Sequence, residues 1–404
     1  MSEGTIRAAG YPWRLYCGTN AIEERMAEAA DRVGAKRAFL ICSKSVNRRT
    51  DTVQRIKDAL GKVYAGVFDG IEKDSTYASV IAAKEAAEAA NADLLIAVGG
   101  GSVIVSVRVV AIYLGEPGNP FEIMTQYPEK KPAFSPRLTA PKLPIINVPT
   151  TPTSAMNRGG SGLKNPDLSH RMEYFDPKTR PSAIFLDDAA LLSAPPNLIR
   201  STATTVFSSL VGAQADTGLN PLAQSDQDMA FRLAYAAYLR LMDEIDNPEL
   251  RRHLALAAFL QNRAEDDGRR RFQTNVFAGN YAVSTAIHIR YPNIGQGEST
   301  SVVHAHAIRL SREIAVVSAR QVAAALSVWQ DGMDARTAAR SVAAKLEEIY
   351  RKIGVPTRLR ELDIVREDLV NIAKGTVKNF NFNPGKRSPS EQIEASLSLL
   401  ESAW

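Results

Sequence analysis

Cysteine is scarce in this chain of 404 residues, which contains only Cys17 and Cys42. Two widely separated cysteines cannot form a disulfide framework, which excludes the small disulfide-stabilised domains of secreted proteins. Long apolar runs are also missing. The longest, residues 103–114, is interrupted by Ser106 and Arg108 and falls short of the roughly 20 residues that a membrane span needs. Because the N-terminus shows no apolar signal core either, we predict a cytoplasmic protein with no membrane partner.

Composition and charge place the chain among ordinary globular proteins. Hydrophobic residues make up 45% and charged residues 23%, which excludes the disordered and fibrous classes. The net charge of +5 comes from basic residues spread along the chain, a pattern that argues against a nucleic-acid partner. Excess Lys and Arg suit an anionic cofactor and a carboxylate-bearing substrate.

The chain has two halves of different character, as its length leads us to expect. In the first half, short apolar runs alternate with helical patterns, which is typical of a parallel sheet covered on both faces. A proline-rich segment at 119–144 reads as a long surface loop. After the paired prolines of Ser193-Ala-Pro-Pro-Asn197, helical patterns predominate. We predict an α/β domain over residues 1–194 and an all-helical domain over 195–404. Strands are expected at 38–42, 63–68, 94–98, 145–148 and 183–186, and helices at 75–92, 197–216, 226–242, 248–264, 317–329, 335–353 and 388–402.

A glycine run follows the third of these strands. The strand leads into Gly99, Gly100, Gly101 and Ser102, and a helix follows. Backbone N–H groups at a helix start, together with the helix dipole, stabilise an anion, and glycine lets a pyrophosphate approach closely. The same pattern suits a tight turn in which Ser102 caps the helix. The motif alone leaves both interpretations open.

A second polar turn follows the next strand. It is Pro149-Thr-Thr-Pro-Thr153, which supplies hydroxyl groups at the carboxyl end of a strand, where α/β sheets bind ligands. Taken alone, such a turn is more often a polar loop than a site. Together the two turns favour a dinucleotide cofactor, with Thr150, Thr151 and Thr153 beside the glycines.

The order of these features resembles the iron-containing (group III) alcohol dehydrogenase family, which is similar to maleylacetate reductases and more remotely to dehydroquinate synthases. The resemblance rests on Gly99–Ser102, Val148-Pro-Thr-Thr151, Phe68-Asp-Gly70 and Arg180-Pro-Ser-Ala-Ile-Phe-Leu-Asp187, and it covers nearly the whole chain. It implies an N-terminal dinucleotide-binding domain, a helical C-terminal substrate domain, and NAD(P) in the cleft between them. A homodimer is expected.

The resemblance assigns the adenosine end of the cofactor to Ser43 and Lys44. Family members often carry an aspartate at the first of these positions, where it binds the ribose. A serine there, with Lys44, Arg48 and Arg49 nearby, tolerates a 2′-phosphate, which slightly favours NADP over NAD. The same cations also suit an ordinary solvated helix start.

The resemblance also implies where a catalytic metal would be held. Metal-dependent members carry an Asp and a His four residues apart, on one helix face, and two further histidines. The corresponding residues here are Phe207, Val211, Ser284 and Gln296. Because none of them is an acid or a histidine, and the chain has only five histidines, we predict no metal cofactor.

Without a metal, another group must accept the alcohol proton. His288, which the resemblance places at a further family histidine, is the leading candidate because imidazole titrates near neutral pH. The alternative is a histidine that stacks on the cofactor or packs in the interior. Lys164 and Tyr281 are weaker candidates. Of His304 and His306, at least one is expected to be structural.

Several residues bear on the substrate. Val105 and Arg108 replace a family Asp and Lys, and residues 152–157 replace an A-G-T-G-S-E run, so the substrate cannot be inherited from the family. One or two of the arginines in segments implied to line the site are expected to bind a carboxylate. These arginines are Arg158, Arg171, Arg180 and Arg290.

The observations favour a metal-independent NAD(P)-dependent oxidoreductase of a polar, carboxylated alcohol or ketone, either a small molecule or a peptide. One form of this hypothesis is oxidation of a β-hydroxy acid, such as the C-terminal threonine of a ribosomal peptide, with loss of CO2. The daptide-type peptide dehydrogenases of this family would fit that chemistry. The alternative is a non-catalytic nucleotide-binding or peptide-maturation partner that kept the fold. A dehydroquinate-synthase-like lyase, which needs a metal at the same place, is the weakest hypothesis.

Overall fold

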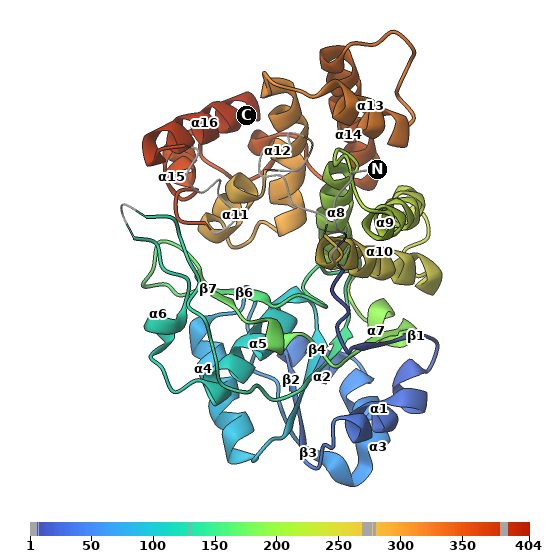
Figure 1. The fold of residues 1–404 in the computed structure, drawn as a ribbon, viewed down its shortest axis with the longest axis vertical. Coiled ribbons are helices and arrows are strands. Elements are labelled where there is room, and N and C mark those ends of the chain that lie inside the picture. Colours follow the sequence, from blue (N-terminus) through green and yellow to red (C-terminus); the bar gives the residue numbers. More distant parts are fainter. Residues whose placement is uncertain (1–5, 7, 129–130, 269–276, 278–279, 380–386) are drawn as a thin grey trace. The chain divides into compact units, whose positions relative to one another are not determined.

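The structure, a computed structural model, describes residues 6, 8–128, 131–268, 277, 280–379 and 387–404. Contacts divide the chain into two compact units (Figure 1). The first comprises Tyr11–Pro195 and Asp246–Ala255, and the second comprises Met1–Gly10, Pro196–Ile245 and Leu256–Trp404. The sequence had not assigned the segment Asp246–Ala255 to the first unit.

The first unit contains a six-stranded parallel sheet in the order β1-β8-β5-β4-β2-β3. A separate antiparallel hairpin, β6–β7, lies beyond β5 in the chain. The predicted α/β unit with a parallel sheet is therefore confirmed. The strands are β1 (Arg14–Gly18), β2 (Ala38–Cys42), β3 (Tyr64–Phe68), β4 (Leu94–Gly99), β5 (Ile145–Pro149), β6 (Gly160–Leu163), β7 (Met172–Phe175) and β8 (Ala183–Asp187).

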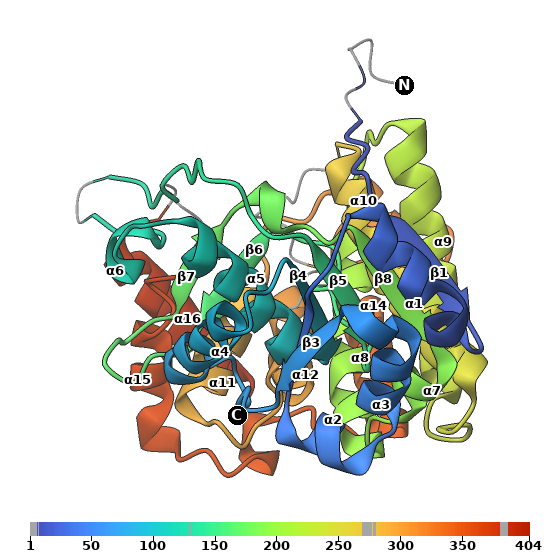
Figure 2. The same cartoon turned by 90° about the horizontal axis from the view of Figure 1, so that it is seen from below.

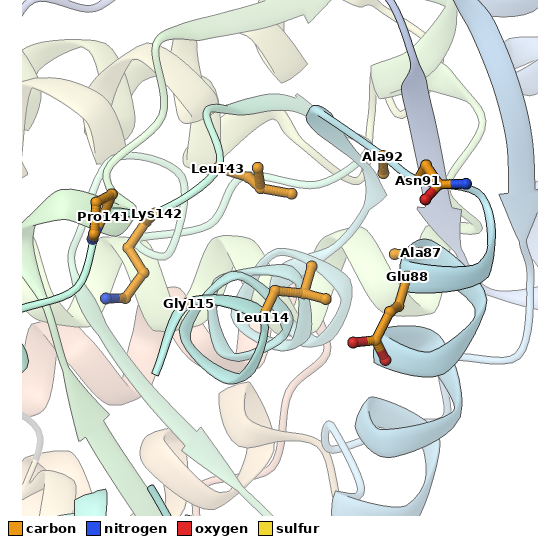
Figure 3. Close-up of a pocket in the computed structure, with 9 residues that line it drawn as sticks. All are labelled: Ala87, Glu88, Asn91, Ala92, Leu114, Gly115, Pro141, Lys142 and Leu143. Atoms are coloured by element: carbon orange, nitrogen blue, oxygen red, sulfur yellow. The ribbon is translucent and has the colours of Figure 1, made fainter. Parts of the chain in front are cut away.

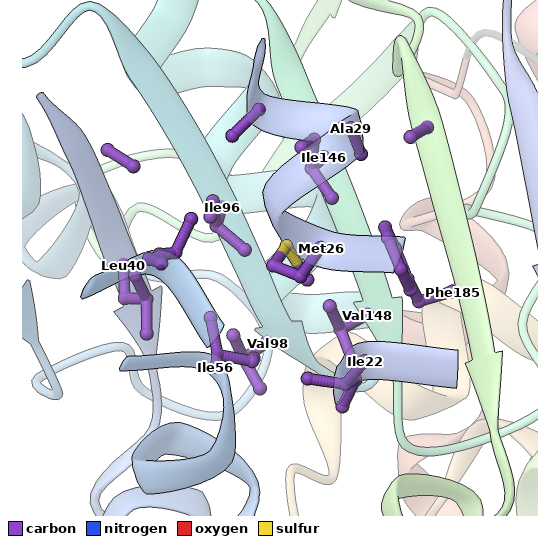
Figure 4. Packing of buried hydrophobic residues seen from close by; sticks show 14 of the residues in the cluster. Ile22, Met26, Ala29, Leu40, Ile56, Ile96, Val98, Ile146, Val148 and Phe185 are labelled. Carbon is purple, nitrogen blue, oxygen red and sulfur yellow. The ribbon is translucent and has the colours of Figure 1, made fainter. Parts of the chain in front are cut away.

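Helices cover both faces of this sheet (Figures 1 and 2). On one face, Ile22 and Met26 of α1 and Ile56 of α3 pack with Ile96 and Val98 of β4 (Figure 4). On the other face, α4 and α5 pack against the strands. All six residues of β4 are buried, which explains its continuous apolar run. The helices of this unit are α1 (Ala21–Arg32), α2 (Lys44–Arg49), α3 (Thr52–Leu60), α4 (Tyr77–Ala89), α5 (Gly101–Gly115), α6 (Pro120–Ile123) and α7 (Asp188–Leu192).

The strand order identifies one edge of the sheet as the place for a ligand. From β2 the chain moves outward to β3, whereas from β4 it moves in the opposite direction to β5. Open α/β sheets bind ligands at the carboxyl ends of strands where the direction reverses in this way. Cys42 of β2 is in register with Val98 of β4, so Ser43 and Gly99 follow neighbouring strands at that edge.

Among its described residues, the second unit contains helices joined by loops and no strand. In α14, Val342, Leu346 and Ile349 are buried at helical spacing, and the carboxylate of Asp334 caps the helix by accepting the N–H of Thr337. Among the described helices, none is both long and apolar enough to cross a membrane. The helices are α8 (Pro196–Ala213), α9 (Pro221–Arg240), α10 (Pro248–Asp266, which begins in the first unit), α11 (Tyr281–Arg290), α12 (Gln296–Leu310), α13 (Val316–Ala325), α14 (Ala335–Ile353), α15 (Leu369–Lys374) and α16 (Pro389–Ser402).

Some elements differ from the sequence-based expectation. Strand β1 was missed because it is an edge strand with no continuously buried face, and β6 was missed because it contains two glycines. Helices α11 and α12 were not predicted, because they are rich in Ser, Thr and His, which weakens the apolar periodicity of their sequences. The predicted loop at 119–144 is not wholly irregular, because it contains α6 and an isolated β-bridge between Gln126 and Phe134.

Candidate active site

The glycine-rich turn joins β4 to α5 at the carboxyl edge of the sheet. Gly99 ends the strand with φ +153°, which L side chains rarely adopt, and a Cβ there would lie 2.8 Å from Cγ2 of Val103. Gly100 is the extended N-cap, and α5 begins at Gly101. The N–H groups of the first helical turn therefore emerge at this edge, where they and the helix dipole stabilise an anion.

The threonine turn packs directly against these glycines. The N–H of Thr150 donates to the carbonyl of Gly99 at 3.1 Å. A Cβ at Gly100 would lie 3.2 Å from Oγ1 of Thr151. A Cβ at Gly101 would lie 3.0 Å from Oγ1 of Thr153. Because glycine has no Cβ, the threonine hydroxyls can approach the backbone of the glycine turn.

The hydroxyl of Thr151 indicates whether a phosphate fits at this turn. Its Oγ1 is buried and makes no hydrogen bond with the described residues. A buried hydroxyl without a partner is costly, and a phosphate oxygen would accept its proton. The turn therefore fits the pyrophosphate of a dinucleotide in two respects, the N–H groups at the start of α5 and the hydroxyl of Thr151 that bonds no described residue.

Ser102 connects this turn to a second loop. It is the second residue of α5, and Gly100 caps the helix, so the alternative in which Ser102 is the N-cap is wrong. Its Oγ accepts the N–H of Asp74 at 3.2 Å, and its carbonyl accepts the hydroxyl of Ser75 at 2.8 Å. Both Asp74 and Ser75 have positive φ, 66° and 56°. The turn residues Asp74-Ser-Thr76 were the available sequence signal, and sequence reasoning assigned them no role.

Lys164 follows β6 and lies near this loop. Its N–H donates to the carbonyl of Ser75 at 3.1 Å, and its own carbonyl accepts the N–H of Tyr77 at 2.9 Å. Its side chain is half-buried. Lys164 is thus connected to the glycine turn through Ser75, which bonds Ser102.

Ser43 and Lys44 lie at the end of β2, next to the glycine turn. Ser43 is the N-cap residue of α2 but makes no side-chain capping bond, and Lys44 is exposed. On the same short helix, the guanidinium of Arg48 lies 4.0 Å from the carboxylate of Asp69, which also accepts the amide of Asn47 at 3.0 Å. Asp69 follows β3, and its contact with Arg48 was not expected from the sequence.

A pocket of about 330 Å³ in the same unit is not the nucleotide site (Figure 3). Its lining includes Ala92 and Leu143, which lie just before β4 and β5, so the pocket is at the amino edge of the sheet. Its charged residues are already paired, Glu88 with Lys84 at 2.6 Å and Lys142 with Glu116 at 2.7 Å.

His288 lies on α11 in the second unit and is 6% exposed. Its Nδ1 lies 2.7 Å from the carbonyl oxygen of Ile294. Because a carbonyl only accepts, Nδ1 carries the proton of the neutral ring and Nε2 carries the lone pair. In this tautomer Nε2 is the ring nitrogen that can accept a proton. Tyr281, at the start of the same helix, is 43% exposed, so the two candidates on α11 differ sharply in burial.

The positions implied for metal ligands carry no acid and no imidazole. Phe207 is fully buried and stacks on Tyr238 with centroids 4.6 Å apart, and Val211 is buried one turn later. Ser284 is buried, with its hydroxyl bonded to its own helix, and Gln296 begins α12. Across the part of the chain that the structure describes, no group of three or more His, Cys, Asp or Glu side chains could hold an ion. These residues do not fit an iron or zinc site.

His304 is hydrogen-bonded at both ring nitrogens. Nε2 donates to the carbonyl of Phe277, and Nδ1 accepts the hydroxyl of Tyr350, both at 2.7 Å. Burial lowers the pKa of His304 to about 4, so the ring is neutral and positions the aromatic side chains. Burial and nearby arginines also lower the pKa of His306 to about 4.

The arginines considered for the substrate differ in their contacts. Arg290 donates to both carboxylate oxygens of Asp368 and thereby holds the pKa of that carboxyl at about 2. It is therefore already paired. Arg180 donates to the carbonyl of Asn157 at 2.8 Å, and its guanidinium lies 3.9 Å from the ring centroid of Tyr11.

Two family models match the chain. One, described as iron-containing alcohol dehydrogenase, matches residues 12–188, and the other, the C-terminal model of the Fe-containing alcohol dehydrogenase family, matches residues 218–403. The chain belongs to the iron-containing alcohol dehydrogenase family. The predicted family and fold are confirmed, and this member of the iron-containing alcohol dehydrogenase family is an alcohol dehydrogenase-like oxidoreductase.

Individual relatives share low sequence identity with this chain. It is 28% identical over 212 residues to maleylacetate reductase 2 of Cupriavidus pinatubonensis, a match that spans 52% of this chain and only 50% of that protein. It is 20% identical over 391 residues to lactaldehyde reductase of Escherichia coli, which covers 94% of this chain and 95% of that one. The structure of sulfoacetaldehyde reductase from Bifidobacterium kashiwanohense in complex with NAD+ has a TM-score of 0.75 at 19% identity and covers 98% of this chain and 99% of that one.

Proposed function

We propose that this protein is a metal-independent NAD(P)-dependent oxidoreductase that acts on a polar, carboxylated alcohol or ketone. The observation that carries the proposal is a contrast. The threonine turn that packs on the glycines carries a buried hydroxyl, on Thr151, that bonds none of the described residues, whereas Phe207 and Val211 occupy positions implied for metal ligands. On this proposal the phosphate end of the site is kept, and at the metal end hydrophobic side chains replace two of the four implied ligands.

The cofactor contacts are assigned to three groups of residues. The backbone of Gly99–Ser102 and the hydroxyls of Thr150, Thr151 and Thr153 hold the pyrophosphate. Ser43 and Lys44 take the adenosine end, and the absence of an acid at Ser43 slightly favours NADP over NAD. The NAD+ complex of the similar sulfoacetaldehyde reductase supports a nicotinamide cofactor, which accepts or supplies the hydride when bound.

His288 accepts the hydroxyl proton of the alcohol substrate. Its Nδ1–H is held by the carbonyl of Ile294, so Nε2 is the basic atom. In the direction of oxidation, Nε2 would accept the hydroxyl proton of the alcohol. In the direction of reduction, the same ring returns the proton.

The substrate class follows from chemistry and charge. Oxidation of a β-hydroxy acid gives a β-keto acid, which loses CO2 through its own internal hydrogen bond. A peptide with a C-terminal threonine is such a substrate. Two relatives, maleylacetate reductase and sulfoacetaldehyde reductase, are named for compounds that carry anionic groups, which supports an acidic substrate.

A panel assay tests this function. Chelator-treated protein is incubated either with NAD+ or NADP+ and 3-hydroxybutyrate or a peptide ending in threonine, or with NADH or NADPH and maleylacetate. Cofactor absorbance and CO2 are then measured. We expect turnover of at least one carboxylated substrate after chelation, with NADP preferred over NAD.

The alternative, a non-catalytic nucleotide-binding or peptide-maturation partner, is favoured by the same hydrophobic residues at the metal positions. It predicts that NADPH binds, seen as quenching of protein fluorescence, while no substrate in the panel is turned over. That outcome would replace the proposed function.

A further inference from the structure

The second unit contains a pocket of about 820 Å³ that includes none of the residues assigned to the cofactor or to proton transfer. Its lining comes from α9, from the end of α13 and the turn after it, and from Gln214, which directly follows α8. The hydroxyl of Ser318 on α13 donates to the carbonyl of Ala215 at 2.7 Å and so joins two of these walls. Small-molecule sites typically measure about 300–1,000 Å³, so the pocket is large enough for a ligand of its own.

One wall of this pocket is aromatic. Phe231 and Tyr235 lie one turn apart on α9, with ring centroids 5.4 Å apart and an angle of 27° between the ring planes. Phe231 is 5% exposed, and Tyr235 also lies nearly parallel to Phe207 of α8 at 6.1 Å, so both rings are held in place by packing. Ala236 and Ala325, which also line the pocket, leave room in front of them. An aromatic ligand can pack against such a wall face-on or edge-on.

Three hydrogen-bond donors of the lining have no oxygen acceptor among the described residues. Nε2 of Gln214 is buried and makes no hydrogen bond with them, which is costly for an amide. The hydroxyl of Tyr235 makes none either, and burial raises its pKa, so it keeps its proton. Arg232 is exposed and contacts only the sulfur of Met229, at 4.0 Å, a weak acceptor. The lining therefore offers donors to a ligand that brings an acceptor.

Asp228 is the acid among the residues that line the pocket, and its carboxylate already accepts a hydrogen bond. Its Oδ1 accepts the side-chain amide of Gln224 at 2.8 Å. Asp228 precedes Arg232 by one helical turn, but within the described residues no ion pair joins the two side chains. The guanidinium of Arg232 is therefore available to an anion that enters from solvent.

We propose that this pocket binds an aromatic carboxylic acid, whose ring packs on the aromatic wall and whose carboxylate accepts hydrogen bonds from Gln214 and Arg232. The inference goes beyond the proposed function and does not depend on it. A carboxylate has two oxygens, so it can take the amide of Gln214 and the guanidinium of Arg232 together. A neutral aromatic compound leaves Arg232 without a counter-charge, and an aliphatic acid makes weaker contacts with the rings. The pocket therefore selects aromatic acids over both.

The test uses 2-naphthoate as the probe, with its neutral amide and the saturated decahydro-2-naphthoate for comparison. Binding to the full-length protein is measured by calorimetry at constant ionic strength, with and without NADPH. We expect 2-naphthoate to bind with a dissociation constant below about 1 mM, and NADPH to leave this value unchanged. The amide and the saturated acid should each bind more weakly.

Three variants locate the probe. Gln214→Glu keeps the shape of the side chain but replaces its donor with a carboxylate, and it should weaken 2-naphthoate at least about thirtyfold. Arg232→Ala removes an exposed charge and should weaken it about fivefold. The control Arg25→Ala changes the net charge as Arg232→Ala does, on a side chain 54% exposed in the first unit, and should have no effect. Thermal unfolding shows that each variant is folded.

Several results would overturn the inference. It fails if 2-naphthoate does not bind wild type, or if it binds Gln214→Glu and Arg232→Ala as tightly as wild type. Equal binding of the amide would show that the pocket does not recognise the charge, and equal binding of the saturated acid would show that it does not recognise the aromatic ring. Loss of 2-naphthoate binding when NADPH is added would assign the probe to the nucleotide site.

Discussion

Replacing Gly100 with valine is expected to raise the dissociation constant of NADPH by at least about a hundredfold, a loss of about 2.7 kcal/mol. The Cβ would lie 3.2 Å from Oγ1 of Thr151, and the two γ-methyl groups would extend beyond it into the space that a phosphate needs. A β-branched residue also resists the adjustments that a flexible side chain could make.

The matched control is Gly10→Val. Apart from its chain neighbours, no described residue has an atom within 4 Å of a Cβ at Gly10, and Gly10 is exposed, so nucleotide affinity should be unchanged. NADPH is titrated by fluorescence, and thermal unfolding shows whether the Gly100 variant remains folded. A folded Gly100→Val protein with wild-type affinity would mean that the glycine run is only a turn.

Replacing His288 with alanine is expected to lower kcat by about a hundredfold to ten-thousandfold, as loss of a general base does, while NADPH affinity stays near wild type. Because His288 is buried and bonded to Ile294, His288→Asn is the sharper variant. Its amide N–H can keep the bond to the carbonyl, but it offers no basic nitrogen. If His288 has only a structural role, His288→Asn should restore the activity that His288→Ala loses. If His288 is the general base, His288→Asn should be as inactive as His288→Ala.

Controls for His288 come from other candidates and from the surface. Lys164 and Tyr281 are the weaker acid–base candidates. Lys164→Met and Tyr281→Phe should therefore reduce kcat less than the His288 variants do. His253→Ala removes a histidine whose side chain is 31% exposed on α10 and should leave kcat unchanged. Wild-type turnover by both His288 variants would remove His288 from the mechanism.

Much of the nucleotide end could be predicted from the sequence, because it depends on short-range patterns. Continuous apolar runs place β2, β4 and β5 within a residue of their observed bounds. The two polar turns follow β4 and β5, which are neighbours in the sheet, so their contact follows from the parallel arrangement. The packing of Thr151 on Gly100 is a detail of that arrangement.

Other features depend on contacts between residues far apart in the chain. The tautomer of His288 is set by the carbonyl of Ile294, which only the turn after α11 brings within reach. Arg108 looked like a substitution in an ordinary helix, and its burial among Arg158 and Arg180 appears only when segment 155–160 folds over α5. Strand β1 lacks a continuous apolar run because it lies at the sheet edge.

The most direct test of the central claim is to measure metal content and turnover on the same purified protein. The protein as purified is analysed for iron and zinc and assayed with NADPH or NADP and the substrate found in the panel. It is assayed again after chelation and after either metal is added back. We predict no stoichiometric iron or zinc, and turnover that chelation does not reduce. Stoichiometric metal whose removal abolishes turnover, and whose return restores it, would contradict the claim that this protein works without the metal of its family.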